Sequence, residues 1–308
     1  MESIDKEALL SLLRNGEAIP NQCISDADLR HCDLQAIHLE GVKFDQVNFS
    51  GTNLSQCQLL NCTFSECDFS QANLSGANLS QCQFTAGFQP AFQNSEVEFS
   101  FEQLSVDTLL SAELKKSGIY GFRTSKNILI EVNLSHASLV DSRLEQVDFS
   151  SANMSYSDLS GANISSCNFN RARLNKAKLE GVECYETSFI DAKLNASLVD
   201  RAYLIKADLS GADLSDAQLA EVTLDQCLLH NVQLDNASFS EIRLVDVEPK
   251  VLNLANVQLE VLHLSGMDLR ETKRLSGDLS GASLDHCNLQ ALDLSPVHWL
   301  MLILIIPT

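Results

Sequence analysis

Residues 207–214 read Ala-Asp-Leu-Ser-Gly-Ala-Asp-Leu, so the triplet Ala-Asp-Leu recurs after five positions. The spacing extends in both directions, with an apolar residue at every fifth position from Leu29 to Phe84 and from Leu134 to Leu179. It continues less regularly to about Leu294. A period of five fits neither the 3.6-residue repeat of a helix nor the two-residue repeat of a half-buried strand. The pattern therefore predicts a repeat architecture.

A second period of twenty residues is superimposed on the first. Four pentapeptides would then form one turn of a four-sided tube. The central apolar residue and the small residue two positions before it would lie inside, and the other three positions would face solvent. Eight of the thirteen glycines stand two positions after a central residue, where a type II turn needs positive φ. We expect phenylalanines twenty residues apart to stack along the tube: Phe44, Phe64, Phe84, Phe149, Phe169 and Phe189.

The sequence resembles the pentapeptide-repeat family, whose motif reads A(D/N)LXX. Matching stretches lie at residues 72–79, 162–164, 207–214 and 282–284. The resemblance covers about three quarters of the chain, and it implies an all-β fold, a right-handed quadrilateral β-helix. It implies little about function, because function depends on the outward residues and not on the fold.

The repeat divides the chain into five parts. Between Phe84 and Leu134 the motif fails, but the five-residue phase is preserved. That stretch is either two and a half degenerate coils or an excursion that returns in register. We favour an irregular element, helical over 105–116, packed against or between two solenoid segments. The expected parts are a capping helix at 1–18, a first solenoid at 19–84, an interruption at 85–130, a second solenoid at 131–298, and an apolar tail at 299–308.

Both ends of the chain carry apolar segments. Residues 3–15 predict a short amphipathic helix with Ser3 as N-cap and Gly16 after its end. Such a helix would cover the unpaired backbone of the first coil, although a partner-binding helix is an alternative. The tail is far shorter than the ~20 residues that span a bilayer. It would close the last coil or form a dimer, and its candidate residues are Trp299, Leu300, Leu302 and Leu304.

The sequence lacks the usual signatures of catalysis. Eight of the ten cysteines occupy the small inward position and Cys184 a central one, as expected for core residues in a reducing compartment. Cys227 should point inward and His230 outward, so they could not share a metal ion. No phosphate-binding glycine loop or zinc-protease motif occurs. We therefore predict a non-enzyme without metal or cofactor, with a serine or carboxylate site across coils as the open alternative.

The net charge of the chain limits the classes of partner that it can bind. The chain has 41 acidic and 21 basic residues, a net charge of −20, which argues against direct binding to nucleic acid or to anionic membranes. Residues 171–206 are the exception, since they carry seven bases against five acids. The surface should thus have acidic ends and a neutral-to-basic band.

Two functions agree with these features. We favour protein–protein interaction with an unidentified partner, as a scaffold or as an effector of a specialised secretion system. The protein would be bacterial and cytoplasmic, without a membrane span. Export remains open because such effectors need no cleavable signal, and a homodimer through the C-terminal end also remains open. An exposed apolar groove beside 85–130 would favour this function.

The alternative comes from the family resemblance. Acidic pentapeptide-repeat proteins of quinolone resistance resemble duplex DNA and bind DNA gyrase or topoisomerase IV. The resemblance implies that carboxylates on successive coils replace phosphates, and a continuous acidic stripe would favour this function. The candidates are Asp208, Asp213, Asp225, Asp268 and Asp285.

Overall fold

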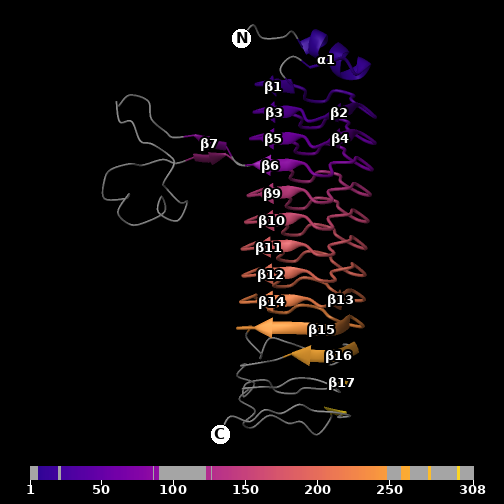
Figure 1. Cartoon of the computed structure of the whole chain (residues 1–308), viewed down its shortest axis with the longest axis vertical. Coiled ribbons are helices and arrows are strands. Elements are labelled where there is room, and N and C mark those ends of the chain that lie inside the picture. Colours follow the sequence, from indigo (N-terminus) through magenta and orange to yellow (C-terminus); the bar gives the residue numbers. More distant parts are fainter. Residues whose placement is uncertain are drawn as a thin grey trace, which may run out of the picture.

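The structure is a computed structural model in which twenty residues make one turn. Lys43 accordingly pairs with Cys23, and Thr63 with Lys43. The turns stack into a straight parallel β-solenoid of about nine turns (Figure 1). This confirms the predicted fold class. The structure describes residues 6–19, 22–85, 87–89, 123–125, 127–247, 258–263, 277–278 and 297–298.

Each turn has four faces, which we call A to D. In one turn their central residues are Phe149 on A, Met154 on B, Leu159 on C and Ile164 on D, and residues twenty apart share a face. Face D forms a ladder of parallel strands through most turns. Its strands are β1 (Cys23–Ser25), β3 (Lys43–Asp45), β5 (Thr63–Ser65), β6 (Gln83–Thr85), β9 (Arg143–Glu145), β10 (Asn163–Ser165), β11 (Glu183–Tyr185), β12 (Tyr203–Ile205) and β14 (Thr223–Asp225).

Face C carries fewer strands. On faces A and B, successive turns are joined by isolated bridges, such as that of Asn133 with Asn153. The strands of face C are β2 (His38–Glu40), β4 (Gln58–Leu60) and β13 (Gln218–Ala220). β15 (Ser238–Val245) crosses the corner, because its first half pairs with β13 and its second half with β14. β16 (Gln258–His263) pairs with β15, and β17 (Gly277–Asp278) pairs with β18 (Val297–His298).

The pentapeptide forms a corner because its residues alternate between inside and outside. In the repeat around Leu74, Ala72 and Leu74 are buried whereas Asn73 is half-buried. The chain then turns, with Gly76 at φ +65° and the Ala77 N–H donating to the Leu74 carbonyl. The predicted positive φ recurs along the stack, but among the described residues it is non-glycine residues that hold it at 30 corners. Glycine is thus preferred and not required at these corners, although a left-handed backbone costs most residues about 1 kcal/mol.

Backbone hydrogen bonds between turns offset that cost. Asn133 N–H donates to the Ala72 carbonyl, while Leu134 N–H and His136 N–H donate to the carbonyls of Asn153 and Ser155. Three of the five N–H groups in this repeat are therefore satisfied by the turns on either side.

The predicted phenylalanine stacking is present as two columns on adjacent faces. On face D, the Phe44 and Phe64 ring centroids lie 5.0 Å apart, and those of Phe64 and Phe84 4.8 Å apart. On face A, the ring centroids of Phe149 and Phe169 are 4.7 Å apart, and those of Phe169 and Phe189 5.1 Å apart. All these rings are almost fully buried. Offset stacking adds about 0.5–1.5 kcal/mol per pair to the burial of the rings.

A helix lies at the N-terminal end of the stack (Figure 1). The described part of the predicted helix is α1 (Lys6–Asn15), and the predicted N-cap Ser3 lies outside the described residues. Leu9, Leu10 and Leu13 of α1 are buried in the solenoid core. Gly16 at φ +65° ends the helix, as predicted.

The register passes directly across the predicted interruption. β6 pairs with β9, so Gln83 neighbours Arg143, sixty positions away instead of twenty. The extra residues equal two turns, which explains why the five-residue phase survives. Of the two alternatives, the register favours an excursion that returns in phase, and the solenoid is one continuous stack. The excursion starts and ends in an antiparallel pair beside the stack, β7 (Gly87–Gln89) with β8 (Arg123–Ser125) (Figure 1). The predicted helix at 105–116 lies outside the described residues.

Asn127 joins the two sides of this excursion. Its fully buried amide donates to the carbonyls of Phe64 (3.1 Å) and Thr85 (2.9 Å), and its oxygen accepts the Cys67 N–H at 2.9 Å. The side chain thus satisfies three backbone groups of the turn that the chain leaves and rejoins.

The C-terminal candidates cannot be placed. Asp268, Asp285, Trp299, Leu300, Leu302 and Leu304 lie outside the described residues. Among the residues that the structure does describe, no helix is long and apolar enough to cross a membrane.

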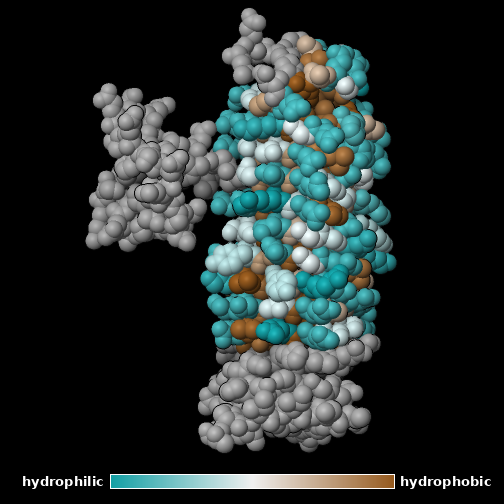
Figure 2. Space-filling model, viewed as in Figure 1, coloured by the Kyte–Doolittle hydropathy of each residue, from teal (hydrophilic) through white to brown (hydrophobic). Residues whose placement is uncertain are grey.

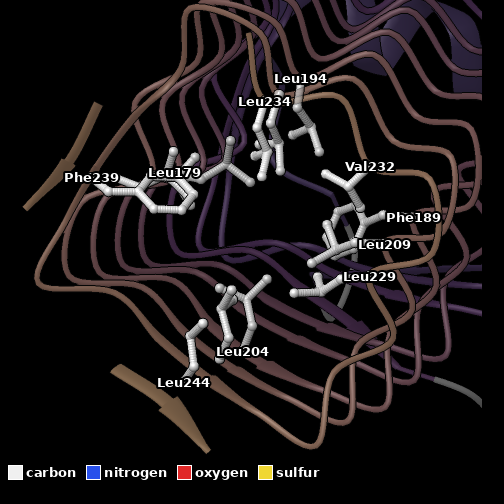
Figure 3. A pocket seen from close by; sticks show the side chains of 14 residues that line it. Leu179, Phe189, Leu194, Leu204, Leu209, Leu229, Val232, Leu234, Phe239 and Leu244 are labelled. Atoms are coloured by element: carbon white, nitrogen blue, oxygen red, sulfur yellow. The ribbon is translucent and has the colours of Figure 1, made fainter. Parts of the chain in front are cut away.

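A small cavity lies inside the C-terminal half of the solenoid (Figure 3). Its volume is about 40 Å³, and only apolar side chains line it. The aromatic column of face A ends at Phe189 and continues as Leu209 and Leu229, which leaves space around the axis. A cavity of this size could hold water, but nothing polar is present to bind it.

Leu209→Phe should therefore stabilise the protein. The larger ring extends the stack below Phe189 into the cavity, and we expect a gain of about 1 kcal/mol, measured by urea and thermal unfolding. The control is Leu134→Phe on face B, a buried position that does not line the cavity, where overpacking should cost about 1–3 kcal/mol. Equal effects of the two changes would contradict the explanation.

Candidate functional site

Many outward side chains stabilise the stack itself. On face B, the Asn73 amide donates to Asn53, Asn133 to Asn73, and Asn153 to Asn133, at 3.2–3.3 Å. The oxygen of Asn73 also accepts the Ser75 N–H. The side chain one position before the central residue is thus often hydrogen-bonded within the solenoid. The two positions after the central residue are therefore left for binding a partner.

The predicted DNA-mimic residues lie apart. Asp208 is on face A, Asp213 on face B and Asp225 on face D, so they form no single stripe. Asp208 accepts the Ser210 N–H at 2.9 Å, and Asp213 accepts the Ser215 N–H at 3.2 Å. Lys193 lies 3.8 Å from Asp213. The first two carboxylates therefore have the local structural role that asparagine has in other turns.

A wide hollow on the surface lies at the corner between faces C and D. We call it the corner groove, and its volume is about 520 Å³. Gly161 and Gly181 occupy consecutive turns at this corner, between Asp141 and Arg201, and leave a gap in the column of side chains. A side chain on Gly161 would meet the Asp141 carboxylate, whereas the space at Gly181 is open. The lining residues are Val140, Asp141, Ser160, Gly161, Glu180, Gly181, Glu183, Arg201, Tyr203 and Glu221.

The corner groove is acidic with one aromatic wall. Four carboxylates line it against one guanidinium, and Arg201 lies 3.7 Å from Glu180. Tyr203 is 56% exposed, and Tyr185 on the preceding strand of face D is 42% exposed. Pale and brown side chains interrupt the hydrophilic surface over β11, β12 and β14 (Figure 2). This combination suits a partner that brings cationic and apolar groups together.

Sequence reasoning missed this groove. Gly161 and Gly181 were interpretable only as turn residues, and the carboxylates around them come from turns twenty and forty residues apart. Two glycines at the same corner in consecutive turns were the one available signal.

The cysteines are hydrogen-bonded core residues. Among the described residues, nine are present and none forms a disulfide, and seven of the nine are buried. Inward thiols donate to the carbonyl 23 positions earlier, as Cys57 does to Leu34 (3.1 Å) and Cys227 to Leu204 (3.2 Å). Ser142 makes the same bond to Leu79. The predicted burial is confirmed for these seven, whereas Cys32 is half-buried and Cys287 lies outside the described residues. The hydrogen bond that explains why cysteine and serine share this position was not foreseen.

Burial also makes these thiols weak nucleophiles. It raises the pKa of Cys57 and Cys227 to about 11 and that of Cys67 and Cys184 to about 12. Because the thiolate is the reactive species, these groups are inert at neutral pH. Within the described part of the chain, no cluster of three histidine, cysteine or acidic residues could hold a metal ion.

Comparisons with known proteins agree with this geometry. One family model, described as pentapeptide repeat region, matches residues 37–119. Another, described as pentapeptide repeats (8 copies), matches residues 128–165, 167–202, 183–216 and 212–247. No curated protein matches the chain.

Two solved structures of other proteins match the chain. HetL, a pentapeptide repeat protein involved in heterocyst differentiation regulation in the cyanobacterium Nostoc sp., is 19% identical over 96% of both chains, with a TM-score of 0.39. QnrB1, a plasmid-mediated fluoroquinolone resistance protein, is 18% identical over 88% of this chain and 92% of its own, also with a TM-score of 0.39.

The raised thiol pKa values predict loss of stability in alkali. Thiols of the unfolded chain ionise near pH 9, whereas Cys67 keeps its proton in the folded state to about pH 12. The unfolded state therefore loses protons first, and folding stability falls as pH rises above 9. Each such thiol should contribute about 1.4 kcal/mol per pH unit. Cys67→Ser should reduce the slope of unfolding free energy between pH 9 and 11 by that amount.

Urea unfolding under reducing conditions measures this slope. Cys23→Ser is the matched control, since Cys23 is exposed and should leave the slope unchanged. An unchanged slope in Cys67→Ser would show that this thiol ionises without unfolding.

Proposed function

The chain belongs to the pentapeptide-repeat family, and on that premise we propose that it is a non-catalytic protein that binds a protein partner through the corner groove. The observation that carries the proposal is the exposed Tyr203 ring beside a hollow of about 520 Å³. Tyrosine is enriched at interfaces, and binding energy concentrates on a few such residues around pockets.

The frame around the groove supports a binding role. Glu183 and Tyr203 are carried by β11 and β12, and each of these strands is hydrogen-bonded to neighbouring strands on both sides. A surface held in this way loses little conformational entropy when a partner docks. The free thiols agree with a reducing compartment such as the bacterial cytoplasm. A scaffold and a secreted effector would both act through this surface.

The charge of the groove indicates the chemistry of the partner. Asp141, Glu183 and Glu221 line the groove together with one arginine, Arg201, which already lies beside Glu180. A lysine or arginine of the partner entering the gap at Gly181 would meet carboxylates on several sides. Its alkyl chain could pack on Tyr203, which also favours cations over its ring face. The proposed partner surface is therefore basic.

Tyr203→Ala should weaken partner binding about 30-fold, since hot-spot truncations cost about 2 kcal/mol or more. The full-length protein serves as bait in cell extract, and the captured protein is then purified and titrated by calorimetry. Leu228→Ala is the matched control, because Leu228 is 48% exposed but lies on face A. A partner bound equally by both variants would contradict the proposed site.

A second candidate function is mimicry of duplex DNA toward gyrase or topoisomerase IV. The observation that favours it is the distribution of charge over residues 127–247. Eleven of the eighteen acidic residues there lie on faces C and D, with five of the nine basic ones. If this surface replaces phosphates, the active carboxylates are those around the corner groove and not the scattered Asp208, Asp213 and Asp225.

A gyrase supercoiling assay tests this alternative. The native protein should inhibit supercoiling, and the triple variant Glu180→Gln, Glu183→Gln, Glu221→Gln should lose the inhibition. The triple variant Asp148→Asn, Asp208→Asn, Asp213→Asn, on faces A and B, removes the same charge and should keep the inhibition. Without inhibition by micromolar native protein, DNA mimicry toward gyrase is contradicted, while the calorimetric test of Tyr203 stands independently.

A further inference from the structure

Face B differs from the other faces because it lacks carboxylates over six consecutive turns. This is unexpected in a chain with 41 acidic residues. The register places these turns in succession, with Asn73 beside Asn133 across the excursion. The outward residues are Asn53, Ser55, Gln56, Asn73, Ser75, Gly76, Asn133, Ser135, His136, Asn153, Ser155, Tyr156, Arg173, Asn175, Lys176, Lys193, Asn195 and Ala196.

The last two of these turns carry exposed cations. We call Arg171, Arg173, Lys176 and Lys193 the cationic patch. Arg173 and Lys193 lie on face B, whereas Arg171 stands at the corner between faces A and B and Lys176 at the corner between faces B and C. Within the described part of the chain, Arg171, Arg173 and Lys176 have no carboxylate at ion-pair distance, and Lys193 lies 3.8 Å from Asp213. Most cations on faces C and D differ, because Arg143, Lys178, Arg201 and Lys206 are each paired with a carboxylate.

Ring contacts hold one of these cations in place. The Lys176 ammonium lies 5.4 Å from the Tyr156 ring centroid, and the His136 ring stacks on Tyr156 at 4.8 Å. These residues occupy the same corner in three consecutive turns. A cation is attracted to the face of an aromatic ring, so the Tyr156 ring favours this position of the Lys176 ammonium before any partner arrives.

Repulsion within the patch also favours an anionic partner. Arg173 and Lys193 are bridge partners on adjacent turns, which lie about 4.8 Å apart. Like charges at such positions destabilise a sheet. Asp213 offsets only the Lys193 end of this pair. An anion that bridges Arg173 and Arg171 would remove the repulsion and complete the hydrogen bonding of two guanidinium groups.

We propose that the cationic patch binds an acidic segment of a partner protein. The arginine guanidinium donates two parallel hydrogen bonds to a carboxylate. Alternate side chains of an extended chain project about 6.7 Å apart on one side, and a few acidic residues along one turn would match Arg171, Arg173 and Lys176. Nucleic acid fits less well, because its continuous charge would extend beyond the patch to Asp213 and Asp216 on the next turn. This surface is separate from the corner groove.

Fluorescence anisotropy with the full-length protein tests the proposal. The probes are a labelled twelve-residue peptide of alternating Glu and Thr, and a labelled twelve-nucleotide oligothymidylate. The triple variant Arg171→Gln, Arg173→Gln, Lys176→Gln should bind the peptide at least about tenfold more weakly than native protein. The matched control Arg143→Gln, Lys178→Gln, Lys206→Gln removes the same net charge and should change binding less than about twofold. Binding should also weaken as salt approaches ~0.1 M and above.

Three results would overturn the proposal: no binding of the peptide, equal weakening by both triple variants, or tighter binding of the oligonucleotide that the patch variant abolishes. The last would assign the patch to nucleic acid. Because all the substituted side chains are exposed, both variants should keep the native melting temperature. Arg173→Gln alone repeats the comparison if the triple variant unfolds.

Discussion

The whole structure depends on the hydrogen bonds between one turn and the next. A twenty-residue turn cannot satisfy its own backbone, and in the repeat around Leu134 three of five N–H groups donate to neighbouring turns. Unpaired buried N–H and C=O groups are costly, so neighbouring turns must keep the same register. That constraint explains the fixed columns of side chains, the left-handed corners at non-glycine residues, and the helix over the first turn.

The same constraint separates what the sequence predicts from what it does not. A five-residue period with phenylalanines twenty apart is sufficient for the solenoid and the ring stacks, since both repeat within one turn and its neighbour. The direct junction of Gln83 with Arg143 was one of two alternatives, because the preserved phase agrees with both. Asn127 was missed because its role exists only where the chain leaves the stack and returns.

The surfaces were harder to predict than the core. Asp208, Asp213 and Asp225 look similar in the sequence, but the four-sided turn places them on three faces and occupies the first two with local hydrogen bonds. The corner groove and the cationic patch each combine residues from several turns. Neither feature becomes visible until the columns are aligned across the sixty-residue step at the excursion.

The junction at Asn127 has a consequence for how such a chain can change. Turns on both sides are bonded directly to each other, and one buried amide replaces the groups that a continuous chain would have supplied. The segment that leaves the stack after Thr85 is therefore not needed for the hydrogen bonding between these turns. Segments of other lengths and sequences could be exchanged there without changing the register of any turn, as long as β7 and β8 begin and end at the same points. The solenoid would then be a constant scaffold that carries an interchangeable inserted segment.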